Sequence, residues 1–318
     1  MTNKITKAAL AASLFALTAC SSSASSAAAS SSSAATVKTG TESTYAYLLD
    51  TTDLEKPDYD LSTADGVLKS VLEKGVLTIA TSPDYPAAEW VSDDGVVYGS
   101  EMMLAKYIAD CLGVDLAIET MDFSSTLVAV DTGKVDMAFS GYGWKEDRAE
   151  AYELTDGYIG DPDSVSYHTL ICLAGQEDNY NSCEDFVGKH ILAQASSLQQ
   201  MYVEDQIIAL DPDAGTELEF VSTLDQAILG LAAGKCDAVA LDGTTAENYV
   251  AQSDGQFALT GVKFDLTMYG THEGNVAAAK KGETSIIDFV NACIEVSAEN
   301  GYYIEWAAEA KAAAGIED

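Results

Sequence analysis

The chain has 318 residues, of which 47% are hydrophobic, so it has enough apolar side chains to build two packed domains. Its 51 acidic residues far outnumber its 16 lysines and arginines, and the formal net charge is −35. A surface this acidic repels the phosphate backbone of DNA and RNA, so the composition argues against a nucleic-acid partner.

Residues 1–20 are predicted to be a secretion signal. Lys4 and Lys7 give a positive start, and the apolar segment 8–17 is too short to span a membrane. The small residues leading up to Cys20 resemble the lipobox of bacterial lipoproteins, which is cut before the cysteine and lipidated on it. This implies a lipid anchor at Cys20, on the outer face of the cell membrane or the periplasmic membrane surface. The alternative is a plain signal peptide with an accidental cysteine.

Residues 21–64 contain no periodic element. Residues 21–36 are almost entirely serine and alanine, which cannot bury a core and indicate a flexible tether. Residues 37–64 carry tyrosines and leucines that suit docking on the folded body, but their spacing predicts neither a helix nor a strand. We therefore treat this part as an N-terminal extension of a folded region that begins at Asp65.

From Asp65 onward, apolar runs typical of buried strands alternate with helical patterns. A short helix stopped at Gly75 precedes a strand over 76–80, and a helix opening at Ser100 and capped by Gly113 precedes a strand over 114–121. Strand, helix, strand, helix, strand is the pattern of a doubly wound α/β sheet.

A motif of helix, turn and strand occurs twice in the sequence, first at residues 125–148. Its first copy predicts a helix with Leu127, Val128 and Val130 turned inward, a C-terminal cap at Gly133 and a buried strand. The second copy, residues 222–243, repeats the Ser-Thr-Leu start, the apolar helix, the Gly-Lys turn and the buried run. A motif repeated about 100 residues apart predicts two similar α/β lobes rather than a solenoid.

Each copy ends in a loop that carries a charge. The first ends in a glycine loop, Gly141–Gly143, followed by Arg148, and the second ends at Asp242. Ligands of open α/β sheets bind outside the carboxyl ends of the strands, so a cation and an anion are expected to face each other across a cleft. The alternative is a pair of ordinary strand–loop junctions with solvated charges.

The second lobe is predicted from a further set of elements. Strands are expected over 167–174, 191–194 and 218–221, and Ser197 with Gln200 fits a capping box that opens a helix over 198–210. A strand over 276–279 and helices over 286–299 and 303–314 are expected to return to the first lobe. The predicted fold is α/β, with two doubly wound lobes joined by two crossing strands. Lobe 1 is expected over 65–165 and 272–318, and lobe 2 over 166–271.

The cysteines and histidines indicate no metal site. Five cysteines follow Cys20 without a C-x-x-C pair, and the three histidines are scattered at surface or strand-end positions. We expect buried thiols at Cys111, Cys236 and Cys293, and Cys172 and Cys183 are candidates for a disulfide. No cofactor is expected.

Residues 65–318 resemble the substrate-binding proteins, family 3, of bacterial polar amino-acid ABC importers, in their lipoprotein form. The motifs that carry the resemblance are a first strand and Tyr-Pro loop at 75–86, Tyr98-Gly99 with Leu104-Ala105 downstream, Gly133-Lys134-Val135-Asp136, Glu146-Asp147-Arg148, Lys280-Lys281-Gly282 and Asn300-Gly301-Tyr302. Each motif is weak alone, but the order and spacing behind a lipobox are specific.

The resemblance implies a bilobed protein that captures a free amino acid and delivers it to ABC permease and ATPase subunits. Arg148 would hold the ligand carboxylate through its planar fork, and Asp242 would hold the ammonium. The backbone of Gly141 and Gly143 would add donors. The remaining ligand-binding candidates are Ser196 and Ser197 at a helix N-terminus, Tyr85 and Phe123 as a sandwich for the ligand side chain, and Ser82.

The sequence departs from the family pattern around the ligand side chain. Lys145 replaces a usual threonine, Gly143 a frequent serine, and Ala88 a frequent phenylalanine. Ser82 stands where binders of cationic amino acids often carry an acid. These departures argue mildly against arginine or lysine, and the amino acid stays open.

Two other functions remain open at this point. One is an enzyme resembling the cyclohexadienyl dehydratases, for which Glu89 is the candidate general acid. The other is a ligand-sensing surface lipoprotein or adhesin that serves no importer.

Overall fold

The computed structural model describes residues 51–92, 95–162, 166–270, 272 and 274–316, and the backbone of 35–36 and 45–48. The predicted signal, Cys20 and most of the tether lie outside the described residues. No helix within the described ranges is both long enough and apolar enough to cross a membrane.

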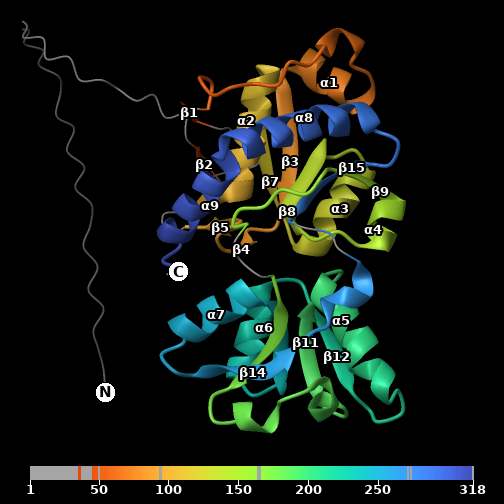
Figure 1. Ribbon diagram of the computed structural model, residues 1–318, viewed down its shortest axis with the longest axis vertical. Helices are drawn as coiled ribbons and strands as arrows, with labels where there is room; N and C mark the ends of the chain where they lie inside the picture. The colour runs from red at the N-terminus through yellow and green to blue at the C-terminus, as the bar shows by residue number, and fades with distance from the viewer. Residues whose placement is uncertain are drawn as a thin grey trace, which may run out of the picture. The chain divides into compact units, whose positions relative to one another are not determined.

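The first lobe is built on a sheet of mixed direction (Figure 1). The strand β3 (Val76–Thr81) pairs in parallel with both of its neighbours, and the strand that returns from the second lobe, β15 (Val276–Lys280), pairs antiparallel. The order is β7 (Asp115–Thr120), β3 (Val76–Thr81), β8 (Met137–Tyr142), β15 (Val276–Lys280) and β9 (Tyr152–Leu154). Because β9 pairs antiparallel with β15, the strands β7, β3, β8 and β9 run in one direction and β15 runs in the opposite one.

Helices from both ends of the folded chain pack together on this lobe. The C-terminal pair, α8 (Thr284–Asn300) and α9 (Tyr302–Ala313), packs against α1 (Gly66–Lys74) and α2 (Ser100–Leu112) (Figure 1). Their buried side chains form one apolar cluster with β3 and β7. The helix α3 (Phe123–Asp131) contributes to a separate cluster with β8, and α4 (Glu146–Ala151) follows β8. The C-terminal segment thus belongs to the first lobe.

The second lobe repeats this plan with a different strand order. The order is β12 (Glu217–Val221), β11 (His190–Gln194), β13 (Ala238–Asp242), β10 (His168–Leu173) and β14 (Phe257–Lys263). β11 pairs in parallel with β12 and β13, whereas β10 pairs antiparallel with β13 and β14. Its helices are α5 (Leu198–Gln206), α6 (Leu224–Ala232) and α7 (Gly243–Gln252). Two apolar clusters fill this lobe.

A third, small sheet includes part of the N-terminal extension. Its order is β1 (Ala35–Thr36), β2 (Tyr45–Leu48), β6 (Val96–Tyr98), β5 (Glu89–Val91) and β4 (Asp84–Tyr85). The sequence assigned no element to residues 37–64, yet β2 pairs in parallel with β6. Short 3₁₀ helices complete the chain: η1 (Leu61–Thr63), η2 (Glu177–Asn179), η3 (Cys183–Phe186), η4 (Ile208–Leu210) and η5 (Leu266–Tyr269).

The first copy of the repeated motif corrects two predictions. Asp122 caps α3 by accepting from the Ser125 N–H, so the helix starts at Phe123 and its buried face differs from the predicted one. Val128, expected inside, is 57% exposed. The strand β8 also continues through Gly141 and Tyr142, which were predicted to lie in a loop. The cap at Gly133 is confirmed by its φ of +70°.

The predicted pairing of Cys172 with Cys183 is not formed. The cysteines of the described residues are free thiols, and burial raises the pKa of Cys172 to about 11, which keeps it protonated. Cys236 and Cys293 are buried as expected, whereas Cys111 is half-buried.

The chain passes between the two sheets twice. On the two passages Tyr158 and Asn275 pair antiparallel, with N–H to carbonyl distances of 2.9 and 3.1 Å. The buried carboxylate of Glu101 accepts from the Tyr158 hydroxyl and from the Asn275 side-chain amide, each at 3.0 Å. The lobe boundaries at 165/166 and 271/272 stay a prediction, because residues 165 and 271 lie outside the described residues.

Candidate functional site

A cavity of about 680 Å³ lies between the two sheets and is lined by both lobes. Seven of the predicted ligand-binding residues line it: Arg148, Asp242, Ser197, Gly141, Gly143, Tyr85 and Phe123. Ser82 and Ser196 do not belong to this lining. The carboxyl ends of β8, β11 and β13 all meet the cavity, as expected for ligand sites in open α/β sheets.

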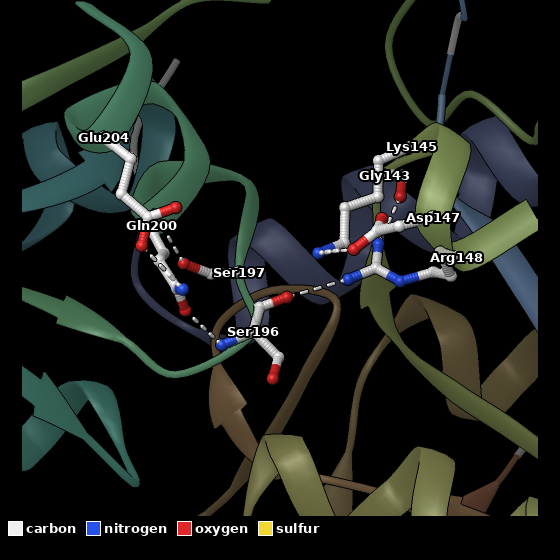
Figure 2. A network of polar contacts seen from close by, with 8 residues as sticks. All are labelled: Gly143, Lys145, Asp147, Arg148, Ser196, Ser197, Gln200 and Glu204. Atoms are coloured by element: carbon white, nitrogen blue, oxygen red, sulfur yellow. Dashed lines mark hydrogen bonds and ion pairs between the residues drawn. The ribbon is translucent and has the colours of Figure 1, made fainter. Parts of the chain in front are cut away.

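Arg148 is the buried cation of the cleft. It lies in α4 rather than on the predicted loop, and only 3% of the residue is exposed. Its guanidinium donates to the carbonyl of Gly143 and, at 3.0 Å, to the carbonyl of Ser196 from the other lobe (Figure 2). The group also lies 4.9 Å from the centre of the Tyr142 ring.

These partners leave the charge of Arg148 without a counter-ion. Its Nε has no hydrogen-bond partner, and no carboxylate forms an ion pair with it among the described residues. The neighbouring Asp147 pairs with Lys145 instead, at 3.1 Å (Figure 2). Burial lowers the pKa of Arg148, which reflects the cost of keeping an isolated charge away from water. The site therefore favours an anionic ligand group.

Ser196 and Ser197 contribute in different ways. Ser197 caps α5, and its hydroxyl accepts from the Gln200 N–H at 3.1 Å, as predicted. Gln200 does not complete the capping box, because its side-chain oxygen accepts from the Ser196 N–H instead (Figure 2). Ser196, with φ of +67°, turns its carbonyl toward Arg148. Ser196 thus acts through its backbone.

Asp242 supplies an anion from the second lobe. It ends β13, and its Oδ1 caps α7 by accepting from the Thr245 N–H at 3.1 Å. Burial, and then the charge of Asp242, raise the pKa of Tyr85 well above its ordinary value. Asp242 is thus held in place by a helix N-terminus and faces the tyrosine that was predicted to sandwich the ligand.

The Tyr85 ring packs directly against the backbone of Gly141. A side chain at Gly141 would lie 2.7 Å from the Tyr85 ring, and its φ is +58°. The Gly141 N–H donates to Glu101 at 2.9 Å, so its predicted role as a ligand donor is corrected. Phe123 lines the cleft and packs against Tyr142 with ring centres 5.2 Å apart.

The comparisons with known proteins agree with this architecture. Residues 77–177 match the family model of bacterial extracellular solute-binding proteins, family 3. In this segment the chain is therefore similar to family 3 solute-binding proteins. It is 22% identical over 240 residues to the L-cystine-binding protein TcyJ of Escherichia coli K12, covering 74% of this chain and 83% of that relative. It is 25% identical to the arginine-binding extracellular protein ArtP of Bacillus subtilis, covering 75% and 88%.

Solved structures give the same result for the fold. The substrate-binding protein AbpA of Streptococcus pneumoniae, bound to L-arginine, has a TM-score of 0.69 and 26% identity, covering 79% of this chain and all of that one. An ancestral arginine-binding protein bound to glutamine has a TM-score of 0.64 and 25% identity, covering 74% and 97%. The predicted bilobed fold is confirmed.

Asp84 joins the two lobes next to Ser82. Ser82 is buried and donates its hydroxyl to Asp84 at 2.9 Å. The other carboxylate oxygen of Asp84 accepts from the Gln194 side chain and from the Leu224 N–H at the start of α6, both at 2.9 Å. This end of the cleft is therefore occupied by contacts between the lobes.

Several lining residues were missed in the sequence. His168, Gln199, Tyr202 and Trp144 line the cleft, although we had predicted only surface or strand-end roles for the histidines. His168 is the first residue of β10 and lies opposite Asp242 in the sheet register. The signal that could have identified His168 is its position at the same edge of the sheet as Asp242, which is one of the predicted charged residues of the site.

Glu89 does not reach the cleft as the enzyme alternative requires. It is fully buried, neither carboxyl oxygen has a hydrogen-bond partner among the described residues, and it is not part of the cavity lining. Burial and the neighbouring Glu101 raise its pKa well above the ordinary value, so the neutral acid is favoured. Within the described part of the chain, no cluster of three or more metal-binding side chains is present.

Proposed function

We propose that this protein captures a free α-amino acid between its lobes and delivers it to the permease and ATPase subunits of an ABC importer. The observation that carries the proposal is the buried guanidinium of Arg148, which has no counter-ion among the described residues. A ligand carboxylate would pair with it, and carboxylates fit the planar fork of arginine. The relatives named for cystine and arginine binding support this class of ligand.

Asp242 is assigned to the ligand ammonium in this proposal. Its carboxylate lies on the cleft from the lobe opposite Arg148, so one ligand zwitterion would connect both lobes. Ser197, Gly143, Tyr85 and Phe123 surround the space between the two charges. The assignment of this cleft to binding rather than catalysis rests on Glu89 lying outside the lining.

A thermal-shift screen against the twenty amino acids tests the proposal directly. A ligand present at 100 times its Kd stabilises the protein by about 2.7 kcal/mol, which gives a clear upward shift of Tm. The Arg148→Met variant serves as the matched control, because it lacks the proposed carboxylate partner. If no amino acid shifts the wild type, or if the same ligand shifts the control equally, the proposal is wrong.

We also propose that Cys20 carries a lipid that anchors the protein to the membrane surface. The apolar stretch before Cys20 and the serine-alanine stretch after it support this. Replacing Cys20 with alanine is expected to release the protein from washed membranes, whereas the Cys172→Ala variant should remain bound. Equal retention of both variants would contradict the anchor.

A further inference from the structure

Two cysteine thiols lie together in the first lobe, where the helices α2 and α8 pack side by side (Figure 1). Cys111 is the second-last residue of α2, and Cys293 lies in the middle of α8. Cys293 is fully buried in the apolar cluster of this lobe, and the half-buried Cys111 packs against the same cluster. The Cys293 thiol donates a hydrogen bond to the sulfur of Cys111. Neither residue belongs to the lining of the cleft, so the pair is separate from the candidate ligand site.

The surroundings of Cys111 favour its thiolate form. The hydrogen bond from the Cys293 thiol is the main cause that lowers the pKa of Cys111. Tyr107 and the ammonium of Lys56 act in the same direction, whereas burial and the charge of Asp110 oppose it. Burial, and then the contact with Cys111, raise the pKa of Cys293, so this thiol keeps its hydrogen. Of the two cysteines, Cys111 is thus the more accessible one and the one that forms a thiolate first.

Part of the N-terminal extension holds a positive charge beside this pair. The Nζ of Lys56 donates to the carbonyl of Asp110 at 2.6 Å. One residue earlier in the extension, the carbonyl of Glu55 accepts from the Tyr107 hydroxyl at 2.6 Å. The ammonium is therefore fixed to the residue next to Cys111, and the pair is surrounded by three segments that are far apart in the sequence.

The remaining cysteines of the described residues lack these features. Cys172 and Cys236 are buried, and burial raises the pKa of both thiols. Cys183 is half-buried like Cys111, but burial and the charge of Glu184 raise the pKa of its thiol. Cys183 therefore shares the half-buried position of Cys111 without its lowered thiol pKa, which makes it a matched control.

We propose that Cys111 and Cys293 are a redox-active dithiol, which a disulfide compound oxidises to an intramolecular disulfide between α2 and α8. Cys111 is the attacking thiol, and Cys293 is the resolving thiol. Sulfur atoms that are already hydrogen-bonded need only a small approach to reach the S–S bond length of about 2.05 Å. The proposed location outside the cytoplasm brings the protein into contact with such oxidants.

The oxidation is a thiol–disulfide exchange in two steps. The Cys111 thiolate attacks one sulfur of the oxidant R–S–S–R, the S–S bond of the oxidant breaks, and R–S⁻ leaves and takes up the proton that Cys111 released. The sulfur of Cys293 then attacks Cys111 Sγ in the mixed disulfide, and the second R–S⁻ leaves and takes up the proton of Cys293. The two cysteines together lose two electrons, and one R–S–S–R is reduced to two R–SH.

The resulting disulfide closes a long loop of the chain. The loop runs from α2 to α8 and contains all five strands of the second lobe. A cross-link that closes a long loop stabilises a protein mainly by restricting its unfolded chain. The oxidised protein is therefore expected to unfold at a higher temperature than the reduced protein.

Peptide mapping after oxidation tests the proposal. The full chain is reduced, the reductant is removed, oxidised glutathione is added, and the remaining thiols are blocked with iodoacetamide. Trypsin then releases Cys111 within residues 107–134 and Cys293 within residues 282–311. Wild type is expected to give these two peptides joined by a disulfide in most molecules. Its Tm should rise by several degrees and return to the starting value when dithiothreitol is added.

Three single variants test the roles of the two thiols. Cys293→Ala should stop at the mixed disulfide, so that the Cys111 peptide carries one glutathione. Cys111→Ala should leave the buried Cys293 thiol unmodified, and its Tm should not respond to oxidised glutathione. The matched control Cys183→Ala should give the same joined peptides as wild type. In wild type, Cys111 should react at least tenfold faster than Cys183. If wild type gives no joined peptides, or if Cys183 reacts as fast as Cys111, the proposal is wrong, whether or not the Cys293 variant folds.

Discussion

Each copy of the repeated motif ends at the cleft with one charged residue, but the two charged residues differ in burial and in hydrogen-bond partners. In the first lobe Arg148 is buried in a helix, with carbonyls as partners and no anion among the described residues. In the second, Asp242 is half-buried and already accepts from the N-terminus of α7. The cation is thus unsatisfied without a ligand, whereas the anion is partly satisfied. The shared supersecondary structure therefore places both charged residues at the cleft. Helix capping and burial determine how strongly each charge needs a ligand as its partner.

The largest effect is expected at Arg148. Arg148→Met should weaken amino-acid binding by about 3–5 kcal/mol, because the ligand carboxylate would lose its buried partner. The same change should raise the Tm of the ligand-free protein, since an isolated buried charge is removed. Calorimetry and thermal unfolding measure the two effects. Undiminished affinity would show that the carboxylate binds elsewhere.

Asp242→Asn should have a smaller effect on binding and little effect on stability. The ammonium would lose its counter-charge, which we expect to cost about a hundredfold in Kd, or about 2.7 kcal/mol. Asparagine caps helices as well as aspartate, so α7 should persist, as circular dichroism can verify. Binding within a few-fold of wild type by a folded variant would indicate a ligand that lacks the amine.

Asp84→Ala tests the contact between the lobes without touching either charge. It removes the two hydrogen bonds that the Asp84 carboxylate accepts from the other lobe, and the one from Ser82, and we expect ligand dissociation to accelerate about tenfold. Stopped-flow release of ligand measures this rate, and small-angle scattering reports the lobe separation. An unchanged rate together with an unchanged radius of gyration would show that Asp84 does not hold the two lobes together.

The last effect concerns the dependence of stability on pH at Glu89, which does not involve ligand binding. Its folded-state pKa is raised, so the folded protein keeps a proton that the unfolded chain releases at lower pH. The stability that this proton contributes is complete below the unfolded pKa and is lost as pH rises through the folded pKa, with a slope of at most about 1.4 kcal/mol per pH unit. Glu89→Gln should flatten this dependence in urea titrations between pH 5 and 8. A parallel pH profile in the variant would exclude Glu89 as its source.

Local sequence patterns predicted helices and strands, but they did not predict contacts between residues far apart in the sequence. The strands β3, β8 and β13 and the cap at Gly133 follow from apolar runs and glycine positions that lie within one segment. Val128 was misplaced because the cap at Asp122 moved the start of α3. Asp84 could not be predicted, because its partners across the cleft lie 110 and 140 positions away.

The candidate site was likewise predicted where it depends on local sequence and missed where it depends on long-range contacts. The sequence predicted which residues face the cleft at the ends of β8 and β13, since sheet edges follow from the order of strands. It did not predict that Arg148 would be buried in α4, because burial there depends on the Ser196 carbonyl from the other lobe. His168 was missed since its position opposite Asp242 follows from antiparallel pairing with a strand about 70 residues away.

Glu101 connects the two passages between the lobes to the cleft. One carboxylate holds the Tyr158 hydroxyl and the Asn275 amide on the two connecting passages, and the backbone N–H of Gly141 in the strand beneath the cleft. The two side-chain donors share Oε1, whereas the Gly141 N–H donates to Oε2, so loss of the Gly141 contact would leave a buried carboxylate oxygen without this partner, which is costly. One carboxylate therefore ties both connecting passages to the strand beneath the cleft, so a displacement of either passage would be transmitted to that strand.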